Sequence, residues 1–253
     1  MNKIALSLMM IGLMAFMGCT RCTPEPVTPP VNPLTQTHLA NAPDGCSSYP
    51  DTTVLPINLI GEQATQWCWA ASGEMCMEFL NGGTKICQCD QANNLFPGNG
   101  CCVGNNPPAC DLFLLGPSGS GDWPCNHVNW PDFKDYSFTA QSTVDIGVSG
   151  FTYGPLASGQ NYLSFPDLQN QISCKRKPVI FMWQWNISGI TDQAHLMVAY
   201  GYEVNDSLEG QWVLVNDPAK TYDIIPYSLY VTGSDHNHYL DFYNITGPAS
   251  PSF

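Results

Sequence analysis

Cys68 is the residue at which the sequence first suggests chemistry, because it starts a run of good helix formers that extends to about Leu80. Ala71, Met75 and Phe79 recur in this run at helical spacing and predict one apolar stripe along a helix. At the first turn of a helix, free backbone N–H groups and the helix dipole favour an anion, and the thiolate is the nucleophilic form of cysteine. The position therefore predicts an activated cysteine, and the alternative is that Cys68 is half of a disulfide.

His195 is the predicted partner base of Cys68. Residues 194–202 are typical of a buried strand with His195 at its start, and residues 211–216 predict a second strand. The polar stretch between them predicts an antiparallel hairpin, which brings the start of one strand near the end of the next. Asp217 or Asn216 would then lie beside His195, where a hydrogen bond can fix the tautomer of the imidazole.

The sequence predicts two helices, and residues typical of helix ends mark where each one begins or stops. Thr65 is a candidate N-cap residue for the helix that starts near Cys68, and the Asn-Gly-Gly sequence at 81–83 is a strong stop. A second, short helix is predicted over 166–174, with Ser164 as its N-cap and a basic run directly after it. Together with the strands, these helices predict a mixed fold.

Three blocks of the sequence together resemble the papain-like cysteine peptidases. They are Gln-x-x-x-x-Cys-Trp-Ala-Ala ending at Ala71, Ala-His-Leu-Met-Val-Ala-Tyr-Gly-Tyr at 194–202, and Val-Leu-Val-Asn-Asp-Pro at 213–218. The sequence is most similar to the bacterial branch that includes secreted effector proteases of plant pathogens, since the cysteine-rich stretch after the helix and the stretch 178–183 also resemble that branch. The resemblance covers roughly residues 57–218.

The resemblance implies an α+β, papain-like fold with two halves. An N-terminal helical half would carry Cys68, and a C-terminal antiparallel β-sheet or barrel half, from about residue 179, would carry His195 and Asp217. It further implies that Cys68 is the nucleophile, that His195 is the general base and acid, and that Asp217 orients His195. Asn216 is the alternative third member.

The resemblance also implies an oxyanion hole, formed by the backbone N–H of Cys68 and a glutamine side chain. In papain that glutamine lies six residues before the cysteine. Gln63 lies five residues before Cys68 and is the predicted donor, because Gln66 lies only two residues before it. The implied reaction is acyl transfer through a thioester: the thiolate attacks a peptide carbonyl, His195 protonates the leaving amine, and water releases the acyl-enzyme.

The N-terminal 45 residues predict export. Residues 1–18 have a short basic start and an apolar stretch that is too short for a membrane span, which is typical of a signal peptide. They are followed directly by Cys19, which resembles the lipidated cysteine of a bacterial lipoprotein. Residues 19–45 are rich in proline and predict a tether, with the folded peptidase domain over 46–253. The sequence therefore predicts an exported lipoprotein that is periplasmic or anchored at the outer membrane or cell surface.

The composition excludes some partners and favours an oxidising compartment. The chain has 8 Lys and Arg against 21 Asp and Glu, a formal net charge of −13, which argues against nucleic-acid binding and against docking on anionic lipid. Twelve cysteines favour disulfides. With Cys19 and Cys68 set aside, the other ten, Cys76 among them, could form up to five disulfides. A zinc site in the cluster between Cys87 and Cys125 is the alternative.

Two further groups of side chains carry predictions that depend on burial. Of Trp67 and Trp69, which flank Cys68, one is expected to pack inside and the other to line the cleft. The stretch 235–238, Asp-His-Asn-His, is expected to be an exposed polar turn, with a metal-binding pair of His236 and His238 as the alternative.

The sequence thus predicts a surface-tethered or secreted cysteine endopeptidase that acts on a protein or peptide substrate. No cofactor or metal is expected, no nucleic acid, and no membrane contact beyond the N-terminal lipid anchor. Two alternatives remain open: an amidase or transpeptidase of the same fold acting on peptide cross-links, and a non-catalytic, disulfide-rich binding lipoprotein.

Overall fold

The computed structural model describes residues 37–38, 46, 48–98, 101, 125–186, 194–205, 210–219 and 222–248. The chain divides into two compact units, residues 1–33 and 34–253, and every described residue belongs to the second. The predicted signal peptide, Cys19 and most of the predicted tether therefore lie outside the described residues. Within the part that is described, no helix has the length and apolar character needed to cross a membrane.

The secondary structure combines helices near the N-terminal side with strands that dominate the rest of the chain. The helices are α1 (Cys68–Leu80), α2 (Gln88–Leu95), α3 (Phe165–Gln169) and α4 (Tyr227–Val231), and a π-helical turn, η3 (Asn170–Cys174), continues α3. The strands are β1 (Thr37–His38), β2 (Tyr49–Pro50), β3 (Thr52–Val54), β4 (Thr139–Ser142), β5 (Phe151–Tyr153), β6 (Val179–Trp185), β7 (Ala194–Asn205), β8 (Gly210–Asn216), β9 (Tyr222–Pro226) and β10 (His236–Thr246).

One main sheet organises these strands in the order β5-β4-β10-β6-β7-β8-β9. All neighbours are antiparallel except β4 and β5, which are parallel. The mixed, mostly antiparallel architecture agrees with the predicted α+β class. The predicted β7–β8 pairing is confirmed, with Val198 opposite Asn216.

The sheet is broader than the sequence predicts, because strands before residue 179 join it. β6 pairs with the first half of β7, from Ala194 to Ala199, and β3 pairs with the second half, where Thr52 lies opposite Glu203. β7 has 12 residues whereas β6 has seven, so β3 provides partners for backbone groups that β6 does not reach. Part of the predicted tether is also paired, since β1 forms a two-stranded ladder with β2.

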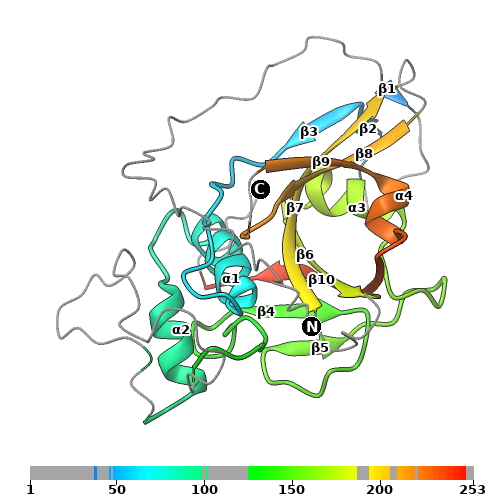
Figure 1. The fold of residues 1–253 in the computed structure, drawn as a ribbon. Helices are drawn as coiled ribbons and strands as arrows, with labels where there is room; N and C mark the ends of the chain where they lie inside the picture. The colour runs from blue at the N-terminus through cyan, green and yellow to red at the C-terminus, as the bar shows by residue number, and fades with distance from the viewer. Residues whose placement is uncertain are drawn as a thin grey trace, which may run out of the picture. The chain divides into compact units, whose positions relative to one another are not determined.

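Helix α1 packs between α2 and the main sheet, where it contacts β7 and β6. The sequence predicts one apolar stripe, but every residue from Cys68 to Met77 is buried. Figure 1 shows α1 and α3 on opposite sides of β7, and Ser72 ties α1 to this strand by donating a hydrogen bond to the Leu196 carbonyl. On another side α2 approaches closely, because a Cβ atom on Gly73 would lie 2.8 Å from Oε1 of Gln91. The helix is thus held rigidly by its surroundings.

Disulfides join segments that are far apart in the sequence. Cys46 is bonded to Cys174 and Cys101 to Cys125, while Cys87 and Cys89 also take part in disulfides. These bonds support the predicted disulfide framework over the zinc alternative. Cys76 does not take part in this framework, because it is a free, buried thiol in the interior of α1.

Candidate active site

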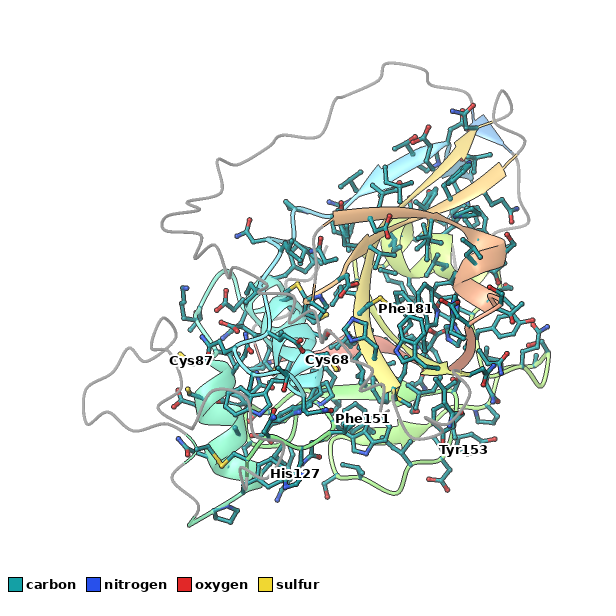
Figure 2. All side chains as sticks on the ribbon, in the orientation of Figure 1. Cys68, Cys87, His127, Phe151, Tyr153 and Phe181 are labelled. Carbon is teal, nitrogen blue, oxygen red and sulfur yellow. A yellow bond between two sulfur atoms is a disulfide. The ribbon has the colours of Figure 1, made fainter. Side chains whose placement is uncertain are left out.

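Cys68 is the first residue of α1 and is a free, buried thiol, so the alternative that it forms half of a disulfide does not hold. Figure 2 shows it at the end of α1 that lies beside β7. The predicted N-cap is wrong: Trp67 occupies the N-cap position without a side-chain cap bond. Thr65 instead exchanges hydrogen bonds with the side chain of Asn126, with an Nδ2-to-Oγ1 distance of 3.0 Å.

Both tryptophans beside Cys68 are fully buried, which corrects the expectation that one lines a cleft. Trp67 Nε1 donates to the Cys125 carbonyl at 2.7 Å, and Trp69 Nε1 donates to the His127 carbonyl at 3.0 Å. A buried indole needs such an acceptor for its N–H group. The turn around Cys125, which the disulfide to Cys101 anchors, therefore braces the start of α1 and fixes the position of Cys68.

His195 and Asp217 meet because β7 and β8 are antiparallel. His195 is the second residue of β7, and Asp217 follows the last residue of β8. The His195 Nε2 atom lies 2.6 Å from Asp217 Oδ1, which also accepts a hydrogen bond from the Ala219 N–H at 2.8 Å. The His195 side chain keeps 14% of its surface exposed and the Asp217 side chain 6%, so the pair is shielded but still accessible to solvent at the ring edge.

Asn216, the alternative to Asp217, faces elsewhere. Successive residues of a strand point to opposite faces, so only one of the two can meet His195. Asn216 is fully buried and its Nδ2 atom donates to the Ile57 carbonyl at 3.3 Å. The structure thus brings together Cys68, His195 and Asp217 and places Asn216 in a structural contact.

His195 links the thiol to the carboxylate. Its Nε2 atom lies 2.6 Å from Asp217 Oδ1, and the Cys68 side chain lies near enough to the ring to raise its pKa. Burial lowers the pKa of His195, but the hydrogen bonds and charges of Asp217 and Cys68 outweigh burial and raise its pKa to about 10. The imidazole is therefore protonated at neutral pH, and it can stabilise a thiolate and give a proton to a leaving amine.

The protonated state of His195 predicts the alkaline pH at which activity is lost. The rate constant kcat/KM for a peptide substrate is expected to fall as the pH rises through about 10, because the imidazolium that protonates the leaving amine is then lost. In Asp217→Ala the fall should shift to lower pH, since the hydrogen bond that raises the pKa of His195 is removed. A pH profile of kcat/KM, with circular dichroism as a control for folding, measures this. A fall at unchanged pH in the variant would contradict the role of Asp217.

Gln63, the predicted oxyanion donor, is directed toward α2. Its backbone N–H donates to Gln88 Oε1 at 2.8 Å, and its side-chain Oε1 lies 3.8 Å from Sγ of Cys89. Glu62 is the residue directly before Gln63 and lies six residues before Cys68. Its backbone N–H donates to the Pro218 carbonyl at 2.9 Å, and burial raises the pKa of its carboxyl.

The two histidines of the 235–238 stretch are buried in β10, which corrects the prediction of an exposed turn. His238 Nε2 lies 2.9 Å from Asp241 Oδ1, and its Nδ1 lies 2.8 Å from the Tyr230 carbonyl. His236 stacks on Trp183, with ring centroids 3.7 Å apart. These contacts give both rings structural partners, and within the described ranges no three His, Cys, Asp or Glu side chains are grouped so as to hold a metal.

A mostly antiparallel sheet with a helix-start cysteine, a strand histidine and a carboxylate in one site defines a domain of the papain-like cysteine peptidase type. Comparison with protein families agrees: the model of the Peptidase_C39 like family matches residues 54–250, and the chain belongs to this family. Membership points to a peptidase and hence to a hydrolase. The comparison with curated proteins found no match.

Proposed function

We propose that this protein is a cysteine endopeptidase that cleaves peptide bonds in a protein or peptide substrate. The observation that carries the proposal is the position of His195, whose Nε2 atom lies 2.6 Å from Asp217 Oδ1 and whose pKa the neighbouring Cys68 side chain raises. A nucleophile, a base and a residue that orients the base within hydrogen-bond reach form the arrangement that covalent acyl transfer needs.

In the proposed reaction Cys68 attacks the peptide carbonyl as a thiolate. A bond forms between Sγ and the carbonyl carbon, and the carbonyl electron pair moves to the oxygen. Collapse of this intermediate breaks the C–N bond, and the imidazolium of His195 gives its proton to the leaving amine. Water, activated by the now neutral His195, hydrolyses the thioester and restores the thiol. Asp217 keeps the ring oriented throughout and stabilises its positive charge whenever the ring is protonated.

The proposal includes export to an oxidising compartment on a lipid anchor. The Cys46–Cys174 and Cys101–Cys125 disulfides support the compartment, because such bonds persist where thiols are not kept reduced. The anchor rests on the sequence around Cys19 and on the proline-rich stretch after it. In this arrangement the tether would hold the peptidase domain away from the membrane.

A thiol-directed peptidyl electrophile tests the nucleophile. The domain is purified without reductant, treated with the probe and digested, and the label is located by mass spectrometry. We expect label at Cys68 and none at Cys76, the other free cysteine in the described part of the chain, because Cys76 is fully buried and burial raises the pKa of its thiol. The Cys76→Ala variant, which should label like the wild type, is the matched control.

An assay of substrate turnover then distinguishes a peptidase from the alternative activities. Quenched fluorescent peptides should be hydrolysed with water as the acyl acceptor. Preferential transfer to an added amine, or turnover of cell-wall peptides alone, would favour a transpeptidase or an amidase, since all three reactions pass through the same thioester. Absence of label at Cys68 would contradict the proposal and favour a binding protein.

A further inference from the structure

Trp183 lies directly beside His195 in the main sheet. The two residues are Cα partners in the antiparallel pairing of β6 with β7. Side chains of directly opposite residues lie on the same face of a sheet, with Cβ atoms about 4.5–5.5 Å apart. The indole of Trp183 is therefore the neighbour of the His195 ring on the β6 side, whereas Asp217 is its neighbour on the β8 side.

Trp183 is the middle member of a row of aromatic side chains on β6. Phe181, Trp183 and Trp185 alternate with Met182 and Gln184 along the strand, so the three rings share one face of the sheet. Ring centroids lie 5.7 Å apart for Phe181 and Trp183, and 5.9 Å apart for Trp183 and Trp185. Phe181, which Figure 2 labels, is fully buried, while Trp183 and Trp185 are only partly buried. The row therefore leads from the core toward the surface.

Contacts with α4 and β10 hold the indole of Trp183 in one orientation. Its Nε1 atom donates to the Tyr230 carbonyl at 3.1 Å, and the His236 ring stacks on it with centroids 3.7 Å apart. His236 is buried, and its two ring nitrogens lie 2.8 Å from Asp235 Oδ1 and 2.9 Å from the Leu229 carbonyl oxygen. An indole whose N–H is satisfied and whose ring is supported in this way can bind a ligand without reorganising.

The exposed part of Trp183 adjoins the catalytic histidine. Among the described residues, β10 covers the indole through His236, α4 covers it through the Tyr230 carbonyl, and the other aromatic rings of β6 flank it. The remaining side is that of β7, where His195 keeps 14% of its own side chain exposed. An aromatic surface therefore borders the site at His195.

In the proposed reaction, this aromatic surface lies on the side of the leaving group. The acyl part of the substrate becomes bonded to Cys68 Sγ, and the departing amine takes its proton from His195. The first residue after the scissile bond must therefore lie beside His195. Asp217 Oδ1 is already in contact with the His195 ring and the Ala219 N–H, so an apolar contact for this residue comes from the β6 side.

We propose that Trp183 is a specificity-determining residue, which binds an aromatic side chain at the first position after the scissile bond. The inference deepens the proposed function and rests on it. The favoured substrates are peptides that are cleaved before an aromatic residue. An indole favours an aromatic partner over a small one, because the two rings bury a large apolar area and can pack edge to face or offset-stacked.

Partition of an acyl-enzyme between water and an added amine tests this without knowledge of the natural substrate. p-Nitrophenyl acetate acetylates Cys68 and releases p-nitrophenolate, which leaves the leaving-group side of the site free. The amine of an added amino-acid amide then attacks the thioester carbonyl, His195 takes a proton from that amine, and Sγ leaves as the thiolate. Water remains the main acceptor for a peptidase. The N-acetylated amide and acetate are quantified by liquid chromatography, and Cys68→Ala gives the non-enzymatic background.

Phenylalaninamide and glycinamide are compared at equal concentrations of free amine. The wild type should form at least about tenfold more N-acetylphenylalaninamide than N-acetylglycinamide. In Trp183→Ala this ratio should fall to about one, whereas Trp183→Phe should keep most of it, because a ring remains beside His195. Trp212→Ala is the matched control and should partition like the wild type, since Trp212 is also partly buried but lies opposite Glu203, toward the far end of β7.

The inference is overturned if the wild type does not prefer phenylalaninamide, or if Trp183→Ala keeps the preference. A purely structural role of Trp183 would lower thermal stability and leave the ratio unchanged. In each of these cases p-nitrophenolate is still released in a burst, so the proposed nucleophile survives. Absence of a burst in the wild type would overturn the proposed function together with the inference.

Thermal unfolding of each variant verifies that it is folded. If Trp183→Ala does not fold, Trp183→Leu replaces it, because leucine keeps apolar bulk at this position without a ring. The ratio in Trp183→Leu should then fall well below that in Trp183→Phe, and equal ratios in these two variants would overturn the inference.

Discussion

Alanine at Cys68 or at His195 is expected to lower kcat for peptide hydrolysis by at least about 10⁴-fold, because a nucleophile and its base act as one unit. For the same reason the double variant should be no slower than either single variant. Cys68 neighbours His195 and raises the pKa of its ring, so removing one side chain leaves the other without its reaction partner. The measurement is steady-state hydrolysis of a fluorogenic peptide by the three variants.

Folding must be verified in these variants, since both residues lie in the interior of the site. Cys68→Ala removes one sulfur atom from a buried position, and the Cys76→Ala variant makes the same change elsewhere in α1. Cys76→Ala is therefore the control and should retain activity. Losses for Cys68 and His195 that simply multiply in the double variant would contradict a shared role and would indicate two independent contributions.

The elements that carry the site follow local sequence rules, and this made much of the site predictable. α1 runs from Cys68 to Leu80, as the run of helix formers and the stop after it indicate. His195 and Asp217 meet because two apolar strands form a hairpin, whose geometry places the start of one strand near the end of the next. Local sequence patterns and short connections thus determine the positions of Cys68, His195 and Asp217.

The oxyanion donor is a fourth position of the site, and its placement depends on contacts between distant segments. Whether Glu62 or Gln63 faces Cys68 is decided by the path of a loop that is tied to Gln88 and Pro218. No periodicity governs such a loop. The prediction of Gln63 as the oxyanion donor therefore rests on residue type and on its spacing from Cys68.

The sequence also did not predict which polar and aromatic side chains are buried. His238 lies in a polar stretch, but it is buried because β10 pairs with β6 and Asp241 and Tyr230 accept its hydrogen bonds. Trp69 is buried because the turn at His127 offers a carbonyl to its indole N–H. The Tyr230 carbonyl comes from α4 and the His127 carbonyl lies 58 residues from Trp69, so the local sequence does not predict these two contacts.

The disulfide between Cys46 and Cys174 is expected to contribute about 4 kcal/mol to the free energy of unfolding, since it closes a long loop in the unfolded chain. The two cysteines are separated by 128 residues, and the bond ties the segment before β2 to the end of η3. The variant Cys46→Ser with Cys174→Ser removes the bond without leaving a thiol that could pair wrongly. Urea denaturation without reductant should show the loss.

The site should be affected less than the stability, because Cys46 and Cys174 lie outside the segments that hold Cys68, His195 and Asp217. The bond secures the part of the fold near β2 and β3, and β3 pairs with the half of β7 that lies beyond His195. At low urea concentration the double variant should therefore still be labelled at Cys68 by the peptidyl probe. Loss of labelling before global unfolding would contradict this separation and would show that β3 is needed to hold His195 in place.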